Sequence, residues 1–198
     1  MTTPITARDR AKAERTDAIL AAAARLFAHR GYSGTSLEDI GAAVGISGPA
    51  VYRHFAGKQA LLAALLIGVS ERLVSGGETV SASHTAPLQR MRELVDFHVD
   101  FALGNADVIR VQDRDLAHLS PDARSDVRRL QRAYIELWIA GLDELIGASR
   151  DELRLRVQAC FGLLNSTPHS TSAAIRSRRD TAELLTTMAL AALLTPAG

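Results

Sequence analysis

The sequence predicts an all-helical protein, and three observations support this fold class. Hydrophobic residues make up 47% of the 198 residues and aromatic residues only 5%, a composition that suits packed helices. No stretch alternates steadily between apolar and polar residues, as a half-buried strand does. No Asn-Gly or Asp-Gly turn joins two β-branched runs, so the usual hairpin signal is missing. We expect about nine helices, divided into an N-terminal three-helix domain (residues 1–57) and a larger helical domain (residues 58–198).

The N-terminal domain contains three expected helices joined by short turns. Gly31 follows the first helix, at a position where glycine reaches a positive φ at little cost. Thr35 and Glu38, three residues apart, have the pattern of a capping box that opens the second helix. Ser47 is placed to cap the third. The expected ranges are 9–30, 35–44 and 47–55.

Six further helices are expected in the larger domain. Pro87 suits a first helical turn, because the N–H that proline lacks has no intrahelical partner there. Gly76-Gly77 and the Ser/Thr-rich residues as far as Ala86 predict a loop. Residues 166–179, with Pro168 and six Ser or Thr, predict another. The expected helices are 58–75, 87–104, 107–118, 121–146, 149–165 and 180–194.

Charge is divided unevenly along the chain, although the formal net charge is only +1. Residues 1–58 carry eight basic and five acidic side chains, a net charge of +3. The remaining fifteen basic and seventeen acidic side chains give −2. A basic N-terminal part on a slightly acidic remainder fits local contact with a polyanion.

Cysteine content and hydropathy indicate a soluble, cytosolic protein without a membrane partner. Cys160 is the only cysteine, which excludes an internal disulfide and suits a reducing compartment. Charged residues begin at Arg8, before any apolar stretch, so no signal peptide is evident. The longest apolar run, from Ala60 to Val69, is too short to span a bilayer.

Residues 37–55 carry the main functional prediction. Ala42 is small where two short helices must approach closely, and Gly45 lies at the turn between them. This is the helix-turn-helix pattern, whose second helix lies in the major groove of DNA. An ordinary helical hairpin has the same apolar spacing and is the alternative interpretation. The apolar positions are Leu37, Ile40, Val44, Ile46, Val51 and Phe55.

The residues after the turn favour DNA binding. Three small residues open the second helix and allow its backbone to approach a partner closely. Polar and cationic side chains gather at its far end, and helix N-termini and such side chains are usual phosphate contacts. These residues are Gly48, Pro49 and Ala50, then Tyr52, Arg53 and His54, followed by Lys58 at the start of the next helix.

The segment resembles the signature of the TetR family of transcriptional regulators over roughly residues 14–65, and the combination of motifs is highly specific. The matching residues are Gly31-Tyr32, Thr35-Ser36, Ile40-Gly41-Ala42, Val44-Gly45-Ile46-Ser47, Val51-Tyr52-Arg53-His54-Phe55 and Lys58. The resemblance implies a DNA-binding domain over residues 1–57 and a ligand-binding and dimerisation domain over residues 58–198.

The resemblance also implies roles for individual residues of the helix-turn-helix. Phosphate contacts would come from Thr35, Ser36, Ser47, Tyr52, His54 and Lys58. The base-facing positions would be Gly48, Pro49, Ala50 and Arg53. As alternatives, Tyr52 could pack internally and His54 could cap the helix end.

A homodimer is implied as well, because one such head contacts too little DNA for high specificity. Two-fold dimers read palindromic half-sites about 34–36 Å apart. As in the family, the contact is expected through residues of about 151–165 and 180–194. The apolar stripes there are Leu153, Val157, Cys160, Phe161 and Leu164, then Leu184, Leu185, Met188, Ala192 and Leu193. The alternative is that both stripes bury only against their own chain.

The family places a small-molecule effector between the fifth and eighth helices, and its binding favours a head spacing that does not fit the operator. Arg110 and Arg114 lie on one helix face, where a guanidinium could receive an acidic ligand bidentately. The alternative there is a solvated or salt-bridged helix. The expected ligand-binding residues are Phe97, Phe101, Arg110, Arg114, Tyr134, Trp138 and Phe161.

The stretch from Arg110 to Asp115, together with residues 163–169, resembles an actinobacterial branch of the family linked to acyl-CoA and branched-chain acid breakdown. The sequence therefore predicts a dimeric repressor that a small effector, an acyl-CoA or a related acidic apolar metabolite, releases from a palindromic operator. The alternatives are a helical small-molecule-binding protein without DNA readout, a multidrug-sensing regulator and a ligand-dependent activator.

Neither an enzyme nor a cofactor or metal site is expected. The chain lacks a Walker A loop, GxSxG, HExxH and a Gly-rich dinucleotide turn. Cys160 has no obvious base nearby in the sequence. Five histidines show no metal-ligand spacing with one another or with Cys160. They are His29, His84, His98, His118 and His169.

Overall fold

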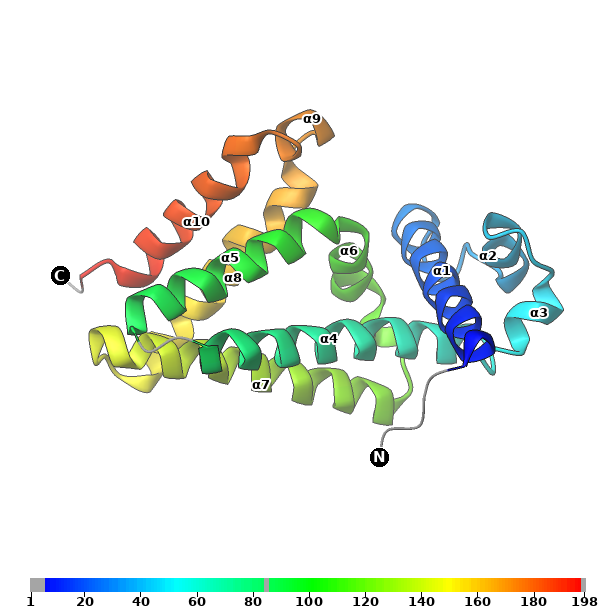
Figure 1. The fold of residues 1–198 in the computed structure, drawn as a ribbon, viewed down its shortest axis with the longest axis horizontal. Coiled ribbons are helices and arrows are strands. Elements are labelled where there is room, and N and C mark those ends of the chain that lie inside the picture. The colour runs from blue at the N-terminus through cyan, green and yellow to red at the C-terminus, as the bar shows by residue number, and fades with distance from the viewer. Residues whose placement is uncertain (1–5, 84–85, 197–198) are drawn as a thin grey trace.

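The computed structural model describes residues 6–83 and 86–196, which form α-helices, one 3-10 turn and no strand (Figure 1). The fold class is therefore confirmed. The elements in chain order are α1 (Ala7–Arg30), α2 (Leu37–Ala43), α3 (Gly48–Tyr52), α4 (Lys58–Ser83), α5 (Pro87–Gly104), α6 (Ala106–Asp115), η1 (Leu116–His118), α7 (Pro121–Ile146), α8 (Arg150–Ser170), α9 (Ala173–Arg176) and α10 (Arg179–Leu194).

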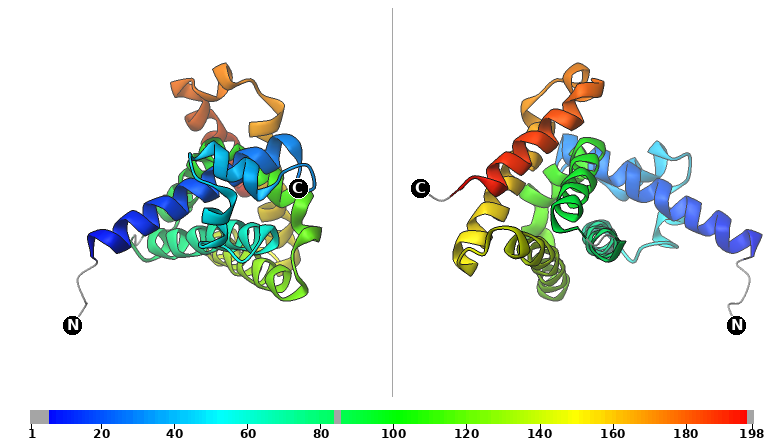
Figure 2. Two further views of the ribbon diagram at one scale, coloured as in Figure 1. Left: turned by 90° about the vertical axis from the view of Figure 1, so that its right-hand side faces the viewer. Right: turned by 60° about the vertical axis from the view of Figure 1, so that its left-hand side comes forward.

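Helices α1 to α3 form a head (residues 6–57) at one end of the molecule, and the other helices form a body (the described residues from 58 onward). Figure 1 shows the head at the end opposite to α10. Helices α4 and α7, of 26 residues each, lie side by side in all views (Figure 2). Helix α6 lies between α1 and the rest of the body.

Two apolar clusters fill the interior, and the first is shared between head and body. It joins Phe27 and Val51 of the head to Leu62 of α4 and to Val111 and Val127 of the body. The second cluster lies entirely in the body, among α5, α7, α8 and α10. Head and body are therefore packed through a common core, although α4 begins at Lys58, where the sequence divides the two expected domains.

Helix α4 is long and apolar enough over residues 58–82 to cross a membrane, by length and composition alone. In this fold the apolar residues of α4 pack in the protein interior. Leu61, Leu62, Leu66 and Val69 are fully buried against neighbouring helices. High hydropathy of this helix therefore coincides with its central position between α1, α5 and α7.

The loop predicted at Gly76-Gly77 is wrong, because α4 continues through both glycines to Ser83. Residues 84–85 of that expected loop lie outside the described residues. A Cβ at Gly76 would stand 2.3 Å from Cζ of Phe97, and one at Gly77 would stand 2.8 Å from Cε2 of Tyr134. The two glycines therefore make room for aromatic rings from α5 and α7 and do not form a turn.

The loop predicted over residues 166–179 is wrong for most of its length. Helix α8 continues to Ser170 with Pro168 inside it, and α9 follows directly. The Arg176 guanidinium donates to the carbonyls of Pro168 (3.0 Å) and Thr171 (2.6 Å), which satisfies acceptors at this helix end. A contact from the next helix thus supports a segment whose own composition favours a loop.

Smaller differences concern helix ends. Helix α1 begins at Ala7, two residues earlier than expected, because Thr6 and Asp9 form a capping box. Helix α3 ends at Tyr52, short of the expected Phe55. The expected helix 107–118 is divided into α6 and η1.

Candidate DNA-binding head and ligand pocket

The sequence indicated that α2 and α3 approach most closely at Ala42, but in the structure they do so at Gly41. Ala42 is exposed, whereas a Cβ at Gly41 would stand 2.8 Å from the carbonyl oxygen of Ile46. Gly45 supplies the turn with a φ of +70°, a conformation that L side chains rarely adopt. The helix-turn-helix geometry therefore depends on two glycines with different roles.

The cap of α2 is shifted by one residue from the predicted Thr35–Glu38 pair. Ser36 and Asp39 form the capping box, with the Asp39 amide donating to Ser36 Oγ at 3.0 Å. These hydrogen bonds hold the pKa of the Asp39 carboxyl below its usual value. Thr35 is only 2% exposed, and its hydroxyl donates to the carbonyl of Gly31 at 2.9 Å.

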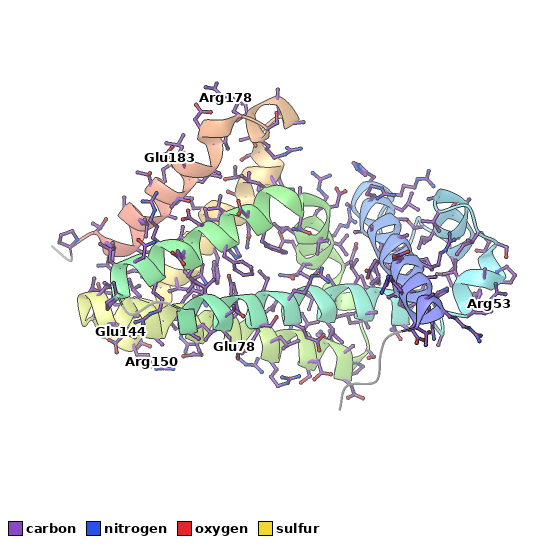
Figure 3. All side chains as sticks on the ribbon, viewed as in Figure 1. Arg53, Glu78, Glu144, Arg150, Arg178 and Glu183 are labelled. Carbon is purple, nitrogen blue, oxygen red and sulfur yellow. The ribbon has the colours of Figure 1, made fainter. Side chains whose placement is uncertain are left out.

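The predicted DNA-contact residues divide into an exposed and an internal group. Tyr52 is 55% exposed, which excludes internal packing for this side chain. Figure 3 shows Arg53 at the outer end of the head. Gly48 and Ala50 face inward, and Gly48 lies against the Glu38 side chain. The exposed residues of the set are Ser36, Ser47, Pro49, Tyr52 and Arg53.

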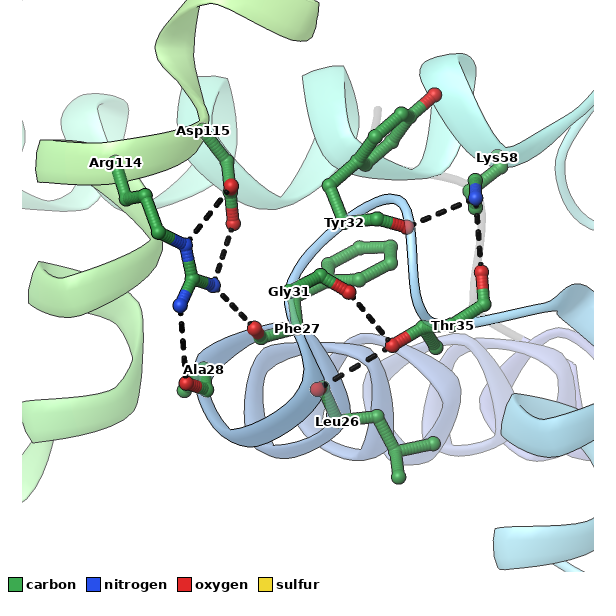
Figure 4. A network of polar contacts seen from close by, with 9 residues as sticks. All are labelled: Leu26, Phe27, Ala28, Gly31, Tyr32, Thr35, Lys58, Arg114 and Asp115. Carbon is green, nitrogen blue, oxygen red and sulfur yellow. Dashed lines mark hydrogen bonds and ion pairs between the residues drawn. The ribbon is translucent and has the colours of Figure 1, made fainter.

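His54 and Lys58 contact other parts of the chain. His54 Nδ1 lies 3.1 Å from the Thr16 hydroxyl of α1. Lys58 Nζ donates to the carbonyls of Tyr32 (2.8 Å) and Thr35 (2.9 Å), as Figure 4 shows. The same ammonium lies 4.5 Å from the centre of the Tyr32 ring. Lys58 therefore ties the turn between α1 and α2 to the start of α4.

Arg114 forms the corresponding link from α6 to the end of α1 (Figure 4). Its guanidinium donates to the carbonyls of Phe27 and Ala28 and also to both carboxylate oxygens of Asp115. Asp115 is 3% exposed, so the pair neutralises a buried carboxylate while it caps α1. Arg114 therefore matches the alternative interpretation of this segment, a salt-bridged helix, in this structure.

A pocket of about 180 Å³ lies between α4, α5, α6, α7 and α8. Of the seven predicted ligand-binding residues, Phe101, Tyr134 and Phe161 line it. Five polar lining residues were missed, because they come from five different helices and only the packing brings them together. They are Ser70, His98, Gln112, Gln131 and Asn165, and no lining residue carries a formal charge at neutral pH.

The other four predicted residues lie elsewhere. Trp138 is fully buried behind the pocket, with its ring centre 4.8 Å from that of Phe161. Phe97 packs over Gly76 and borders a separate, open groove. Arg110 lines a different groove near α1, and Arg114 caps α1.

His98 is the buried polar centre of the pocket. Its Nε2 lies 3.1 Å from Asn165 Oδ1 and its Nδ1 lies 3.4 Å from the Tyr134 hydroxyl. Burial lowers the pKa of His98 to about 4, so the imidazole is neutral at neutral pH. A neutral ring with its proton on Nε2 donates to Asn165 and accepts from Tyr134. The only sequence feature that could have indicated this polar centre was a histidine on an otherwise apolar helix face.

The two stripes expected at a dimer contact differ, because the α8 stripe is largely buried within the chain whereas most of the α10 stripe is exposed. Leu153, Val157 and Leu164 of α8 are buried, as are Leu185 and Leu193 of α10. Three large apolar side chains remain exposed on these two helices, and two of them belong to the predicted α10 stripe. The three are Leu155 (67% exposed), Leu184 (60%) and Met188 (44%).

The described residues offer neither a metal cluster nor an activated thiol. No group of three or more His, Cys, Asp or Glu among them could hold a metal ion. His84, one of the histidines considered above, lies outside the described part of the chain. Burial raises the pKa of the Cys160 thiol to about 12, which leaves it protonated at neutral pH.

Two family models match successive parts of the chain. The family model described as "Bacterial regulatory proteins, tetR family" matches residues 19–65, and the one described as "Tetracyclin repressor-like, C-terminal domain" matches residues 84–169. The transcriptional activator FasR of Mycolicibacterium smegmatis is 35% identical over 88 residues, which span 44% of this chain but only 40% of FasR. The transcriptional repressor KstR2 of Rhodococcus jostii is 25% identical over 84% of this chain and 82% of KstR2.

Solved structures show the same fold. A TetR-family regulator from Bordetella parapertussis superposes with a TM-score of 0.81 at 25% identity, over 91% of this chain and 94% of that one. AibR, in complex with isovaleryl coenzyme A and operator DNA, superposes with a TM-score of 0.74 at 21% identity, over 92% of this chain and 100% of that one. From its helix-turn-helix, its fold and these matches, the chain belongs to the TetR family of bacterial transcriptional regulators.

Proposed function

We propose that the protein is a dimeric repressor of the bacterial cytoplasm that binds a palindromic operator and leaves it when a small effector fills the pocket. One observation carries the DNA-binding part. Tyr52, the last residue of α3, is exposed, and the next residue, Arg53, lies at the outer end of a head whose internal polar groups are already partnered. Side chains presented in this way are free to contact DNA without loss of internal bonds.

The exposed residues divide into two roles in this proposal. Ser47 and Tyr52 contact phosphates, while Pro49 and Arg53 face the bases. Ser36 is exposed, but its hydroxyl already bonds Asp39 in the cap of α2. Thr35 and Lys58 support the head from inside, since their polar groups bond within the chain. The inward-facing Gly48 and Ala50 let α3 pack closely within the head, where Gly48 lies against the Glu38 side chain of α2.

The exposed apolar residues of α8 and α10 support a two-fold dimer. Leu184 and Met188 lie four residues apart on one face of α10, and such a pair of exposed large apolar side chains is a candidate contact surface. Leu155 of α8 is also exposed. A dimer through these helices lies at the far end of each chain from α3, which leaves both heads free. Sedimentation of a monomer at micromolar concentration would contradict this part.

The effector proposed is a short acyl thioester, whose acyl group enters the pocket. A volume of about 180 Å³ is close to that of a cavity that holds benzene, about 150 Å³, so a short or branched chain fits better than a long one. Neutral polar groups such as Gln112 and Asn165 suit the carbonyl of a thioester. The isovaleryl coenzyme A bound to AibR belongs to this ligand class.

Helix α6 supplies the coupling between pocket and head. Ile109 and Gln112 line the pocket, and two residues later Arg114 holds the last carbonyls of α1. A ligand that displaces α6 therefore moves α1 through this link. Repression is relieved if the ligand favours a head spacing that two half-sites cannot accept.

The test is selection of genomic fragments by the purified dimer at moderate salt, which suppresses non-specific phosphate binding. We expect one imperfect palindrome to be enriched, and acyl thioesters to release it. No enrichment with or without thioesters would overturn the DNA-binding proposal. Because FasR is an activator, the second candidate is a ligand-dependent activator. Enrichment only in the presence of the thioester would favour it.

A further inference from the structure

We propose that a second groove, between α1, α6 and the α8–α9 turn, binds the phosphate groups of the effector. The effector is then a thioester of a phosphate-bearing carrier, held by its acyl end in the pocket and by its anionic end in this groove. The inference rests on the proposed function, since it assigns the other half of the same ligand.

The groove has a volume of about 630 Å³ and a lining that includes three arginines and two histidines. Arg25 and His29 come from α1, Arg110 from α6, and His169 and Arg176 from the end of α8 and from α9. Asp107 is the single acidic residue among the described lining residues, and its carboxylate lies 3.8 Å from His29 Nε2. The groove therefore carries a net positive charge, in contrast to the uncharged pocket.

Two of the cations have no competing partner. Arg25 and Arg110 are exposed, and neither forms a hydrogen bond or ion pair with a residue that the structure describes. Arg176 differs, because it already donates to the carbonyls of Pro168 and Thr171. Arg25 and Arg110 can therefore turn toward a phosphate, which guanidinium groups bind bidentately.

The N-terminus of α6 opens on the same groove. Its N-cap Asn105 makes no side-chain cap, because the Asn105 amide donates to the carbonyl of Phe101 at 2.9 Å. Asn105, Ala106 and Asp107 all line the groove. The first-turn N–H groups of a helix lack intrahelical acceptors and favour anions, so they add to the two free guanidinium groups.

A path along α8 joins the pocket to the groove. Phe161 and Asn165 line the pocket, and both also border an open depression that includes His169 and the carboxylate of Asp113. His169 in turn borders the groove. These three α8 residues are four apart, on one helix face, and span about 12 Å at the helical rise per residue. A linear arm of that length reaches from one site to the other.

The division of charge along this path identifies the ligand class. An apolar acyl group suits the pocket, a neutral arm suits the depression, and phosphates suit the groove, an order found in acyl thioesters of coenzyme A. Since Arg25 and His29 belong to α1, a ligand in the groove also bridges head and body. Occupation of both sites would therefore act on the head directly as well as through α6.

The experiment compares two probes on the full-length protein, followed by the fluorescence of Trp138, the single tryptophan. One is a series of coenzyme A thioesters with short, medium and long acyl chains. The other is the same series on N-acetylcysteamine, which lacks the phosphates. The variants are Arg25→Gln with Arg110→Gln, and the matched control is Arg128→Gln. Arg128 is an exposed α7 arginine outside the groove, without a bond to any described residue.

We expect the wild type and the control to bind the best coenzyme A thioester roughly tenfold or more tightly than its truncated counterpart, as charge-assisted hydrogen bonds would give. The double variant should lose this difference and keep its affinity for the truncated thioester. Equal affinities of variant and wild type for both probes would overturn the groove assignment alone. Loss of operator affinity with unchanged thioester binding would assign the groove to DNA phosphates instead. If no thioester binds in either series, the proposed effector class itself is wrong.

Discussion

The outer surface of the head and the pocket of the body are both polar, but they are built in opposite ways. Tyr52 and Arg53 of the head are exposed and come from one short segment. Tyr134 and Asn165 of the pocket come from two helices, and both bond to His98 of a third. Exposed polar groups are hydrogen-bonded by water until a partner binds, whereas buried polar groups must find hydrogen-bond partners within the chain.

This difference separates binding from stability. Changes in and around the pocket should alter the free energy of unfolding, because they disturb buried contacts. Changes on the outer surface of the head should alter DNA affinity and leave unfolding untouched. Each of the following predictions tests one side of that division, in order of decreasing expected effect.

The largest effect concerns the pH dependence of stability through His98. The pKa of His98 is about 4 in the folded protein and 6.5 in the unfolded chain. The stability that the buried neutral ring contributes is therefore fully present above pH 6.5 and is lost as pH falls toward 4. The loss amounts to about 3 kcal/mol in the free energy of unfolding. Urea denaturation from pH 7 to 4 should show this in the wild type and not in His98→Gln. Parallel profiles for the two proteins would contradict a buried neutral histidine.

A pair of glycine substitutions in α4 tests close packing between α4 and α5. Gly76→Ala should destabilise the protein by about 1–3 kcal/mol, because the new Cβ would overlap the Phe97 ring. Gly68→Ala in the same helix meets only the end of Arg72 at 3.8 Å, and should stabilise by about 0.5–1 kcal/mol through helix propensity. Thermal unfolding of both variants gives the comparison. Shifts of the same sign would show that Gly76 is not a packing position.

Arg114→Gln tests the link between α6 and α1. The buried Asp115 carboxylate and the carbonyls of Phe27 and Ala28 would lose their donor, which should cost about 1–2 kcal/mol, since the guanidinium is 44% exposed. Operator release should also need more effector, because the link to the head is weakened. Arg128→Gln on the α7 surface is the control and should change neither quantity. Unaltered release in Arg114→Gln would argue against coupling through α6.

Tyr52→Phe tests the surface of the head and has the smallest expected effect. Removal of one hydroxyl should weaken operator binding by about 1 kcal/mol, roughly fivefold, if it bonds a phosphate. The midpoint of thermal unfolding should stay unchanged, because Tyr52 is 55% exposed. Lys58→Ala gives the contrast, since it should lower stability by freeing the carbonyls of Tyr32 and Thr35. A drop in stability for Tyr52→Phe would break the division between the two regions.

The sequence by itself determined the helical class, the helix-turn-helix and the exposed end of α3. These depend on residues three or four apart and on the turn at Gly45, so the information lies within one short segment. Helix starts at prolines were predictable for the same reason, as α5 and α7 show. Even here the capping box was placed one residue early, since Thr35 and Ser36 are both capable caps and only packing selects between them.

The tertiary structure alone decided what distant residues do. Gly76-Gly77 have the composition of a turn, and only the rings of Phe97 and Tyr134 turn them into packing positions. Arg110 and Arg114 share a helix face, yet only the latter meets the end of α1, 86 residues earlier in the chain. The pocket likewise gathers its polar groups from five helices. Such roles depend on which side chains pack together across the core, and the spacing of residues within one helix does not reveal these tertiary contacts.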